Sequence, residues 1–420
     1  MEITTFFKRF FLLLITFFLT TTSLFAQSYI GFRGPSRNGV YNETGLLKTW
    51  PDGGPQLLWT TEDVGKGFSS PVIVGDRLYI TGLDKDDENE VFLAYTLEGK
   101  KIYEKAYGKP WESYPSDTRV TPTIVGDKAY ITSGVGEVVC INISNGDIVW
   151  KVDGTEFGIN YSTWGIAESP LVFDNIVIFS PGGDNTAMVA INATTGEISW
   201  QSEGFGGLNN YFSPILITHN GKKQIIGVAD NYIIGVNPGT GKIEWKFDDW
   251  GRPDEGENVM PNLPIYLNGR IFFSSGYDIG CFILQLNDDA TAVSLVWHND
   301  DLDTHHGGFV LVNGTVFGTS WINNSQGNWI AVDWESGATR YNTPWGKNGK
   351  GSIIAADNML YCYDERQGTV GLVKANPEEF DVVSEFRITK GRGSHWAHPV
   401  INKGILYIRH GNALMAYKIN

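Results

Sequence analysis

Four segments of this chain repeat one pattern: an alternating apolar run, a short polar turn, a second alternating run and a closing tryptophan. They read "CINISNGDIVW", "AINATTGEISW", "GVNPGTGKIEW" and "LQLNDDATAVSLVW", and they end at Trp150, Trp200, Trp245 and Trp297. Alternation with a period of two predicts β-strands, and turns of Asn, Gly, Thr and Asp tolerate the positive φ angles of tight hairpins. Each segment is therefore predicted to be a β-hairpin.

The closing aromatic recurs along the rest of the chain. Weaker copies end at Tyr103, Tyr341 and Phe386, and Trp59 stands alone near the N-terminus. These eight aromatics follow one another at intervals of 44 to 52 residues. Such an interval accommodates four short strands, which is one blade of a β-propeller. Eight further strand pairs, from "SSPVIVGDRLYIT" to "AHPVINKGILYIR", occupy the remainder of each repeat.

The two ends of the repeat array complement each other. The last strand pair is followed only by "NALMAYKIN", one strand short of a blade, whereas the strand around Trp59 has no hairpin before it. Joining residues 56–61 to the last blade closes the ring and removes exposed sheet edges. We predict an all-β fold, an eight-bladed β-propeller over residues 56–420 whose N-terminal strand closes the last blade.

The hairpins of the "INATTGEISW" type resemble the PQQ-like propeller repeat family, the fold of quinoprotein alcohol dehydrogenases and of a bacterial outer-membrane assembly lipoprotein. The stretch "FRGPSRNGVYNETGLLKTWPDGGPQLLW" is similar to an exported subgroup of that family, and residues 27–55 are read as an N-terminal extension. The resemblance implies the propeller fold but not one activity, because this fold carries unrelated functions. Quinoproteins of this type commonly carry two adjacent cysteines, which this sequence lacks.

The first 26 residues read as an export signal. Lys8 and Arg9 precede the apolar run "FLLLITFFLTTTSLF", and Ala26 is a small residue at a plausible cleavage point. No cysteine follows that point before Cys140, which argues against a lipid anchor, and no later stretch is long and apolar enough to span a bilayer. The mature chain is expected to be periplasmic or secreted.

Charge and cysteine usage limit the partners and the cross-links. The formal net charge of −15 argues against nucleic acid as a partner, because such binding needs a dominant basic surface. Cys140, Cys281 and Cys362 fall in blades 2, 5 and 7 of the repeat count. A disulfide needs Cα atoms within about 7 Å, so all three are predicted to be free thiols.

The innermost strand of each blade lines the channel of a propeller, and the loop entering that strand lies at one mouth. The polar and aromatic residues just before each inner strand are therefore the candidate binding residues. In chain order they are Lys66, Arg119, Trp164, Glu168, Asn210, Tyr211, Asn258, Asn262, His305, His306, Lys350, Arg392, His395, Trp396 and His398.

Four cations in this set belong to neighbouring blades once the ring closes. Lys66, Lys350 and Arg392 stand in "GKGF", "GKGS" and "GRGS" of blades 1, 7 and 8, and Arg119 follows in blade 2. Such an arc would attract a carboxylate or a sulfate. The alternative is that the glycines set tight turns and the cations are solvated.

Four of the seven histidines lie in the two stretches "THHGGF" and "SHWAHP" at the same mouth. His305 and His306 are consecutive, so in a strand at most one of them would point inward. His395 and His398 also face apart in ideal β geometry unless the chain bends before Pro399. A metal site from His305, His395, His398 and Glu168 is an alternative, although its spacing matches no tight-site pattern.

Three functions follow from these residues. The first is a carbon–oxygen lyase or dehydratase that performs β-elimination on uronate-containing, anionic oligosaccharides. Such a reaction needs a cation for the carboxylate, a base and an acid, and histidine, with an ordinary pKa of about 6.5, suits both proton transfers. His395 or His398 would be the base, and His305, His306 or Tyr211 the acid. Trp164 and Trp396 would stack on a sugar ring or pack between blades.

The second function is a dehydrogenase that uses PQQ and calcium, with Glu168, Asn262 and Asp303 in calcium or base roles and Trp164 beneath the quinone. The third is a non-catalytic binding or scaffold module that uses the tops of the blades. Outside the second function no cofactor is expected. The sugar, its linkage and the oligomeric state are left open by the sequence.

Overall fold

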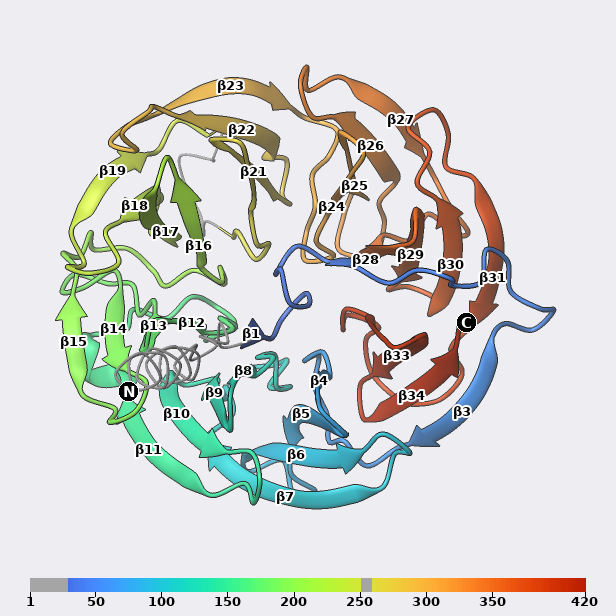
Figure 1. Ribbon diagram of the computed structural model, residues 1–420, viewed down its shortest axis with the longest axis horizontal. Helices are drawn as coiled ribbons and strands as arrows, with labels where there is room; N and C mark the ends of the chain where they lie inside the picture. Colours follow the sequence, from blue (N-terminus) through green and yellow to red (C-terminus); the bar gives the residue numbers. More distant parts are fainter. Residues whose placement is uncertain (1–28, 251–258) are drawn as a thin grey trace, which may run out of the picture.

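The computed structural model describes residues 29–250 and 259–420 and forms a ring of eight sheets around a central axis (Figure 1). Each sheet is one blade, with its innermost strand beside the axis and its outermost strand at the rim. The fold prediction is confirmed. The one helical segment within the described ranges is a single 3-10 turn, Gly154–Phe157. The predicted signal peptide, residues 1–26, and the candidate Asn258 lie outside the described residues.

Strands at the same depth in their blades are equivalent and follow the chain from blade 1 to blade 8. The innermost strands are β4 (Val72–Val74), β8 (Thr123–Val125), β12 (Leu171–Phe173), β16 (Ile215–His219), β20 (Ile265–Leu267), β24 (Val310–Val312), β28 (Gly351–Ala356) and β32 (Val400–Asn402). The second strands are β5 (Arg77–Leu83), β9 (Lys128–Thr132), β13 (Ile176–Phe179), β17 (Lys222–Ala229), β21 (Arg270–Ser275), β25 (Thr315–Thr319), β29 (Met359–Asp364) and β33 (Ile405–His410).

The outer half of each blade is the hairpin recognised in the sequence. The third strands are β6 (Glu90–Thr96), β10 (Glu137–Asn142), β14 (Val189–Asn192), β18 (Tyr232–Val236), β22 (Gly280–Leu286), β26 (Trp329–Asp333), β30 (Thr369–Lys374) and β34 (Ala413–Lys418). The outermost strands are β7 (Lys101–Gly108), β11 (Ile148–Asp153), β15 (Ile198–Gln201), β19 (Ile243–Phe247), β23 (Val293–Asn299), β27 (Thr339–Thr343), β31 (Val382–Arg387) and β3 (Gln56–Thr61).

The ring closes in blade 8, where the early strand β3 pairs antiparallel with β34. The register runs from Gln56 opposite Lys418 to Thr61 opposite Leu414. Residues 56–61 are thus the outer strand of the last blade, as predicted. The guanidinium of Arg409, buried at the same seam, donates hydrogen bonds to carbonyl oxygens of blade 1. The closure therefore joins the two ends of the chain through both sheet pairing and side-chain contacts.

The repeated aromatic and glycine together lock neighbouring blades. The indole of Trp150 donates to the Ala193 carbonyl of the next blade at 2.9 Å, and its ring covers Gly196, where a Cβ would lie 3.0 Å from it. The same pairing of an aromatic with a turn glycine of the following blade recurs at Trp59 and Gly99, Tyr103 and Gly146, Trp200 and Gly241, and Trp297 and Gly337. This contact explains why both residue types recur at one spacing.

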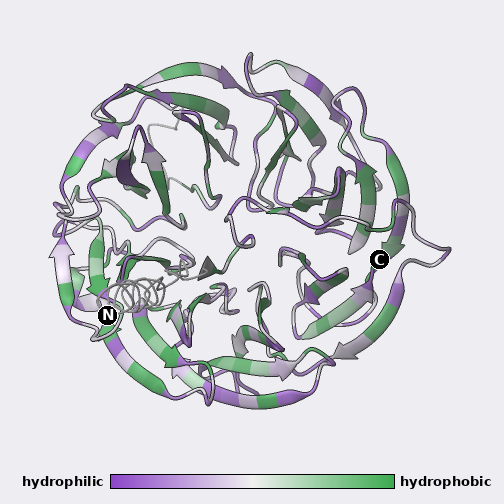
Figure 2. Cartoon of the chain, viewed as in Figure 1, coloured by the Kyte–Doolittle hydropathy of each residue, from purple (hydrophilic) through white to green (hydrophobic). Residues whose placement is uncertain are grey.

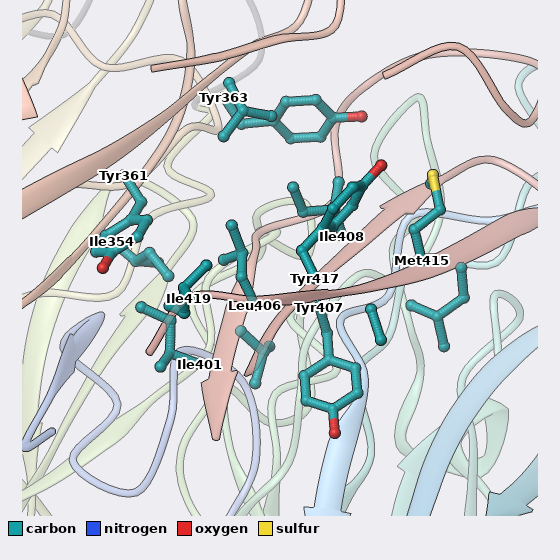
Figure 3. Packing of buried hydrophobic residues seen from close by; sticks show 14 of the residues in the cluster. Ile354, Tyr361, Tyr363, Ile401, Leu406, Tyr407, Ile408, Met415, Tyr417 and Ile419 are labelled. Carbon is teal, nitrogen blue, oxygen red and sulfur yellow. The ribbon is translucent and has the colours of Figure 1, made fainter. Parts of the chain in front are cut away.

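Clusters of buried hydrophobic residues lie between neighbouring sheets. The outer strands alternate between apolar and polar residues (Figure 2). The largest buried cluster lies where the chain ends meet and combines residues of blades 7, 8 and 1, among them Tyr361, Tyr407 and Met415 (Figure 3). Trp50, from the segment before β3, packs edge-on against Phe386 of blade 7. Residues 42–55 thereby cover blade 7 and contribute to the core.

The start of the described chain enters the centre of the ring (Figure 1). β1 (Tyr29–Ile30) adds antiparallel to β8, inside blade 2, and β2 (Val40–Tyr41) adds parallel to β28, inside blade 7. Residues 29–41, which we call the central segment, cross the channel between these two blades. The sequence predicted an N-terminal extension but not this position.

Cys140, Cys281 and Cys362 lie in β10, β22 and β29, in blades 2, 5 and 7, and all three are buried free thiols. The prediction of no disulfide among them is confirmed. None of the helical segments in the described ranges has the length and hydropathy needed to cross a membrane.

Candidate functional site

A cavity of about 360 Å³ opens at one mouth of the channel. Most of its wall comes from residues just before the inner strands, so this mouth lies at the N-terminal ends of those strands. The lining residues are Phe32, Phe68, Pro115, Arg119, Trp164, Ala167, Tyr211, Ser213, Val259, Pro261, Tyr277, His305, His306, Asn324, Trp396 and His398. Seven blades and the central segment contribute to one aromatic-rich site.

Seven of the sequence-predicted residues line this cavity, and seven described ones do not. The seven in the wall are Arg119, Trp164, Tyr211, His305, His306, Trp396 and His398. Those elsewhere are Lys66, Glu168, Asn210, Asn262, Lys350, Arg392 and His395. The structure thus brings half of the described candidates together in one cavity wall, but position before an inner strand does not fix the direction of a side chain.

His305 and His306 both line the cavity, with ring centroids 4.4 Å apart. The expectation that at most one would face inward is wrong, because the two residues lie in a bend before β24 and not in a strand. The hydroxyl of Tyr277 lies 2.9 Å from Nε2 of His305. Burial lowers the pKa of His305 to about 3, so its imidazole is neutral at pH 7.

His306 stands in front of a buried carboxylate. Its Nε2 lies 3.5 Å from Oε2 of Glu365, whose other oxygen accepts a hydrogen bond from Nζ of the buried Lys350. Burial raises the pKa of Glu365 to about 7, against the opposing charge and hydrogen bond of Lys350. Burial also lowers the pKa of His306 well below its ordinary value. The site thus holds a neutral imidazole beside a carboxyl that titrates near neutrality.

His398 is held between two protein groups. The guanidinium of Arg33, in the central segment, lies 2.8 Å from Nδ1, and Nε2 lies 2.9 Å from the main-chain oxygen of His306. Because arginine only donates, Nδ1 accepts and Nε2 donates its proton. No ring lone pair remains for a substrate proton. This arrangement gives no support to a base role for His398.

His395 lies outside the cavity wall, between blades 7 and 8. Its ring stacks on His410 with centroids 3.6 Å apart, and Nδ1 lies 2.6 Å from the hydroxyl of Tyr363. The two histidines of "SHWAHP" therefore do not converge. A base role for His395 has no support from this geometry.

The four predicted cations do not form an arc around the cavity. Lys66 is largely exposed and pairs with Asp87, Lys350 is buried against Glu365, and Arg392 is exposed. Arg119 alone among the four lines the cavity, and its guanidinium donates to the Pro115 carbonyl. Burial raises the pKa of the neighbouring Glu90 to about 8. Burial also lowers the pKa of Arg119, against the opposing charges of Glu90 and Asp117.

Three predicted polar residues support the walls. Asn262 bridges the carbonyls of Thr304 and His305 and accepts from Gly308 N, which fixes the histidine bend. Asn210 accepts from the main-chain amide of Met260. Glu168 is buried, and one of its oxygens accepts from the Ser180 amide.

Tyr277 and Glu365 were missed by the sequence reasoning. Both follow the second strand of their blades, in the loops that lead to the third strand. Because the second strand returns toward the mouth, these loops open at the same end of the channel as the loops before the inner strands. Searching the second loops, which read "SGYDIG" and "YDERQG", would have found both residues.

Comparison with known proteins places this architecture in a family. The family model described as outer membrane protein assembly factor BamB matches residues 40–151 and 98–343, which is more than half of the chain. The chain belongs to this family of PQQ-like propeller repeats.

Solved structures with the same fold include a BamB protein and a quinohemoprotein alcohol dehydrogenase. BamB from Moraxella catarrhalis superposes with a TM-score of 0.62 and 12% identity, over 87% of this chain and 100% of that one. The quinohemoprotein alcohol dehydrogenase from Comamonas testosteroni superposes with a TM-score of 0.64 and 12% identity, over 91% and 78%. At these identities the likeness shows the fold alone.

Among curated proteins, the tetrathionate hydrolase of Acidithiobacillus ferrooxidans is 26% identical over 287 residues, 63% of this chain and 52% of that protein. An uncharacterized protein of Rickettsia conorii is 24% identical over 135 residues, 31% of this chain and 30% of that protein. The chain thus spans about half or less of the length of these relatives.

The residues of the cavity do not fit PQQ with calcium. Glu168 and Asn262 bond to the main chain, as does Asp303, which accepts from the amides of Asp278 and Gly280, and none of the three lines the cavity. Calcium needs several oxygen ligands, yet within the described part of the chain no carboxylate lines the cavity wall. Across residues 29–250 and 259–420, no group of three or more His, Cys, Asp or Glu side chains is placed to hold a metal ion.

Proposed function

We propose that the cavity is the active site of an exported carbon–oxygen lyase that performs β-elimination on uronate-ended oligosaccharides. The observation that carries this proposal is the placement of His306, whose ring lines the cavity while its Nε2 lies 3.5 Å from Oε2 of the buried Glu365. A carboxylate behind a histidine favours the tautomer with the proton on the facing nitrogen and leaves the lone pair on the other. In this proposal the lone pair on the other nitrogen accepts the substrate proton, and the negative charge of ionised Glu365 opposes the burial that lowers the pKa of His306.

The charge around the cavity favours an anionic ligand. Arg119 lies in the wall of the cavity. Arg33 is buried behind the wall, with Nη1 2.8 Å from Nδ1 of the lining residue His398. Burial lowers the pKa of the Arg33 guanidinium only to about 10, so the group keeps its charge. Arg33 bonds to carbonyl oxygens and to His398, and no salt bridge to it occurs among the residues that the structure describes. Two arginine charges near an apolar cavity attract a carboxylate more strongly than the same charges would in water.

The elimination follows from these placements. Arg119 binds the uronate carboxylate and acidifies the adjacent C5–H bond. His306 takes the C5 proton, the electron pair of that bond forms the C4–C5 double bond, and the C4–O bond breaks. In the tautomer with the proton on Nε2, His305 donates to the Tyr277 oxygen, and the phenolic proton passes to the leaving oxygen. Atoms and charges balance without a cofactor.

The aromatic walls suit a sugar ring. Trp164, Trp396 and Phe68 line the cavity, and the rings of Phe68 and Trp396 lie 4.8 Å apart between their centroids. Faces of this kind pack on the C–H surfaces of a pyranose, while the few polar groups fix its orientation. The proposed substrate class is therefore an acidic sugar at the end of a short chain.

A second candidate comes from the relationship to a tetrathionate hydrolase. The same cationic cavity would accept a small inorganic anion, with His306 activating a water molecule in place of a carbon acid. This function uses the same residues but a different substrate.

One screen separates these candidates. The purified mature protein is supplied with uronate-ended di- to tetrasaccharides and, separately, with tetrathionate, and the ultraviolet absorbance of a new C4–C5 double bond and the loss of tetrathionate are recorded. The lyase proposal expects absorbance to rise with at least one saccharide. Loss of tetrathionate alone would replace it with the second candidate. Turnover of neither class, with or without added divalent metal, would leave a binding module as the better interpretation.

A further inference from the structure

We propose that the central segment, residues 29–41, closes the channel beneath the cavity. The site can then bind only the end of a saccharide chain and not its middle. Closure is a property of the fold alone, whereas the chain-end specificity rests on the proposed function. The segment crosses the axis, and its Phe32 forms the floor of the cavity.

The strand pairing gives the path of the segment. All inner strands begin at the mouth that holds the cavity and run away from it. β1 is antiparallel to β8, so the chain first approaches the mouth along blade 2. β2 is parallel to β28, so the chain then descends along blade 7. Residues 31–39 form the turn between them and cross the axis (Figure 1). Phe32, in this turn, lines the cavity.

The turn is fastened to four blades. Arg33 donates to the carbonyl of Phe309 in blade 6, to the carbonyl of Ile353 in blade 7 and to His398 in blade 8. Arg37 donates to the carbonyls of Ser169 and Pro170 in blade 3. A segment bonded on opposite sides of the ring is part of the folded structure.

Glycines make room for this insertion. A Cβ on Gly308, at φ +68°, would lie 2.0 Å from Nη1 of Arg33, and one on Gly39, at φ +75°, would lie 2.2 Å from Nη2. Both positions therefore require glycine for two reasons, the left-handed backbone and the close approach of the guanidinium. Glycine in blade 6 and glycine in the central segment both leave room for the Arg33 side chain.

Phe32 is the residue of the central segment that lines the cavity, and it forms the floor of the site. Its ring lines the cavity and meets His398 edge-on, with centroids 5.0 Å apart. With the axis filled below this ring, a ligand enters and leaves through one mouth, and a long polymer has no path through the ring. The site therefore fits the end of a chain, and Phe32 sets how deep that end can go.

Hydrogen exchange of the full mature chain tests closure without any ligand. We expect the peptide covering residues 29–45 to exchange as slowly as the peptide covering β28, because Gly34, Arg37 and Gly39 donate their amides within the turn and Ala355 donates to Gly39. Arg33→Met should accelerate exchange in both peptides. Complete exchange of residues 29–41 within seconds, as in a free arm, would overturn closure.

The cleavage pattern tests chain-end specificity. With a long uronate polymer labelled at one end, the wild type should release its smallest product from the first time point and no internal fragments. Phe32→Ala should raise KM for the shortest substrate about tenfold, because a buried aromatic contact is lost, while Phe173→Ala, the same change on β12 away from the cavity, should not. Early internal fragments would overturn chain-end specificity. If no acidic saccharide is turned over, the proposed function and its chain-end corollary fail together, and hydrogen exchange alone decides closure.

Discussion

Nη1 of Arg33 lies 2.8 Å from Nδ1 of His398, a contact between residues 365 positions apart in the chain. It joins the central segment to the last blade and fixes the tautomer of His398, whose Nε2 then holds the main-chain oxygen of His306. The position of the proposed base therefore depends on a residue that precedes the whole propeller.

Loss of the Arg33 guanidinium should destabilise the protein strongly. Arg33→Met leaves the buried acceptors at Phe309, Ile353 and His398 without their donor, and each buried unpaired group costs about 1–3 kcal/mol. We expect the free energy of unfolding to fall by at least about 3 kcal/mol in urea denaturation. The exposed Arg387→Met should change it by less than about 1 kcal/mol. Equal effects of the two substitutions would contradict the anchoring role.

The lock between blades can be tested with two turn glycines of similar backbone. Gly241 (φ +74°) would place a Cβ 2.4 Å from the Trp200 ring, whereas Gly221 (φ +81°) has nothing within 4 Å. Alanine at either position costs about 1–2 kcal/mol of backbone strain. Gly241→Ala should lose a further 1–3 kcal/mol or so by crowding the ring. Thermal unfolding of the two variants measures the difference, and its absence would show that the contact does not constrain the blades.

The buried carboxyl of Glu168 should make stability depend on pH. Burial raises its pKa in the folded protein to about 8, above its ordinary value of about 4.3 in an unfolded chain. Between these values the unfolded state loses the proton first, so this group lowers the free energy of unfolding as pH rises from 5 to 8. Glu168→Gln should therefore be increasingly stabilising, relative to the wild type, over that range. A difference that stays constant with pH would show that Glu168 is ionised in the folded protein.

The fold was predictable from the sequence because one physical contact repeats. Each blade contributes one recurring aromatic, and those at Trp150 and Trp200 each cover a turn glycine of the following blade. The interval between successive aromatics is therefore the length of one blade. Trp59, which has no hairpin before it, identified the closing strand. The central segment was not predictable in the same way, because its two strands have two residues each and the turn between them has no period.

The candidate site was predictable in position but not in detail. His305, His306 and Arg119 were found because the loops before inner strands must lie at the mouth. The directions of Lys66 and Lys350 depend on their carboxylate partners, Asp87 and Glu365, which lie 21 and 15 residues further along the chain in loops that carry no recognisable motif. His395 and His398 stand three residues apart, yet different packing partners turn one toward His410 and the other toward Arg33.

The most direct test of the central claim is the pH dependence of elimination in variants of His306 and Glu365, followed by ultraviolet absorbance on a saccharide that the parent turns over. The pKa of Glu365 is raised by burial to about 7, so its ionised form, which orients His306, increases as pH rises through 7, and the wild-type rate should rise over the same range. His306→Gln and Glu365→Gln should each lower kcat by about 10²- to 10⁴-fold. The residual rate of Glu365→Gln should no longer rise near pH 7, while Glu379→Gln, at an exposed position, should match the wild type. A wild-type rate in His306→Gln would contradict the account.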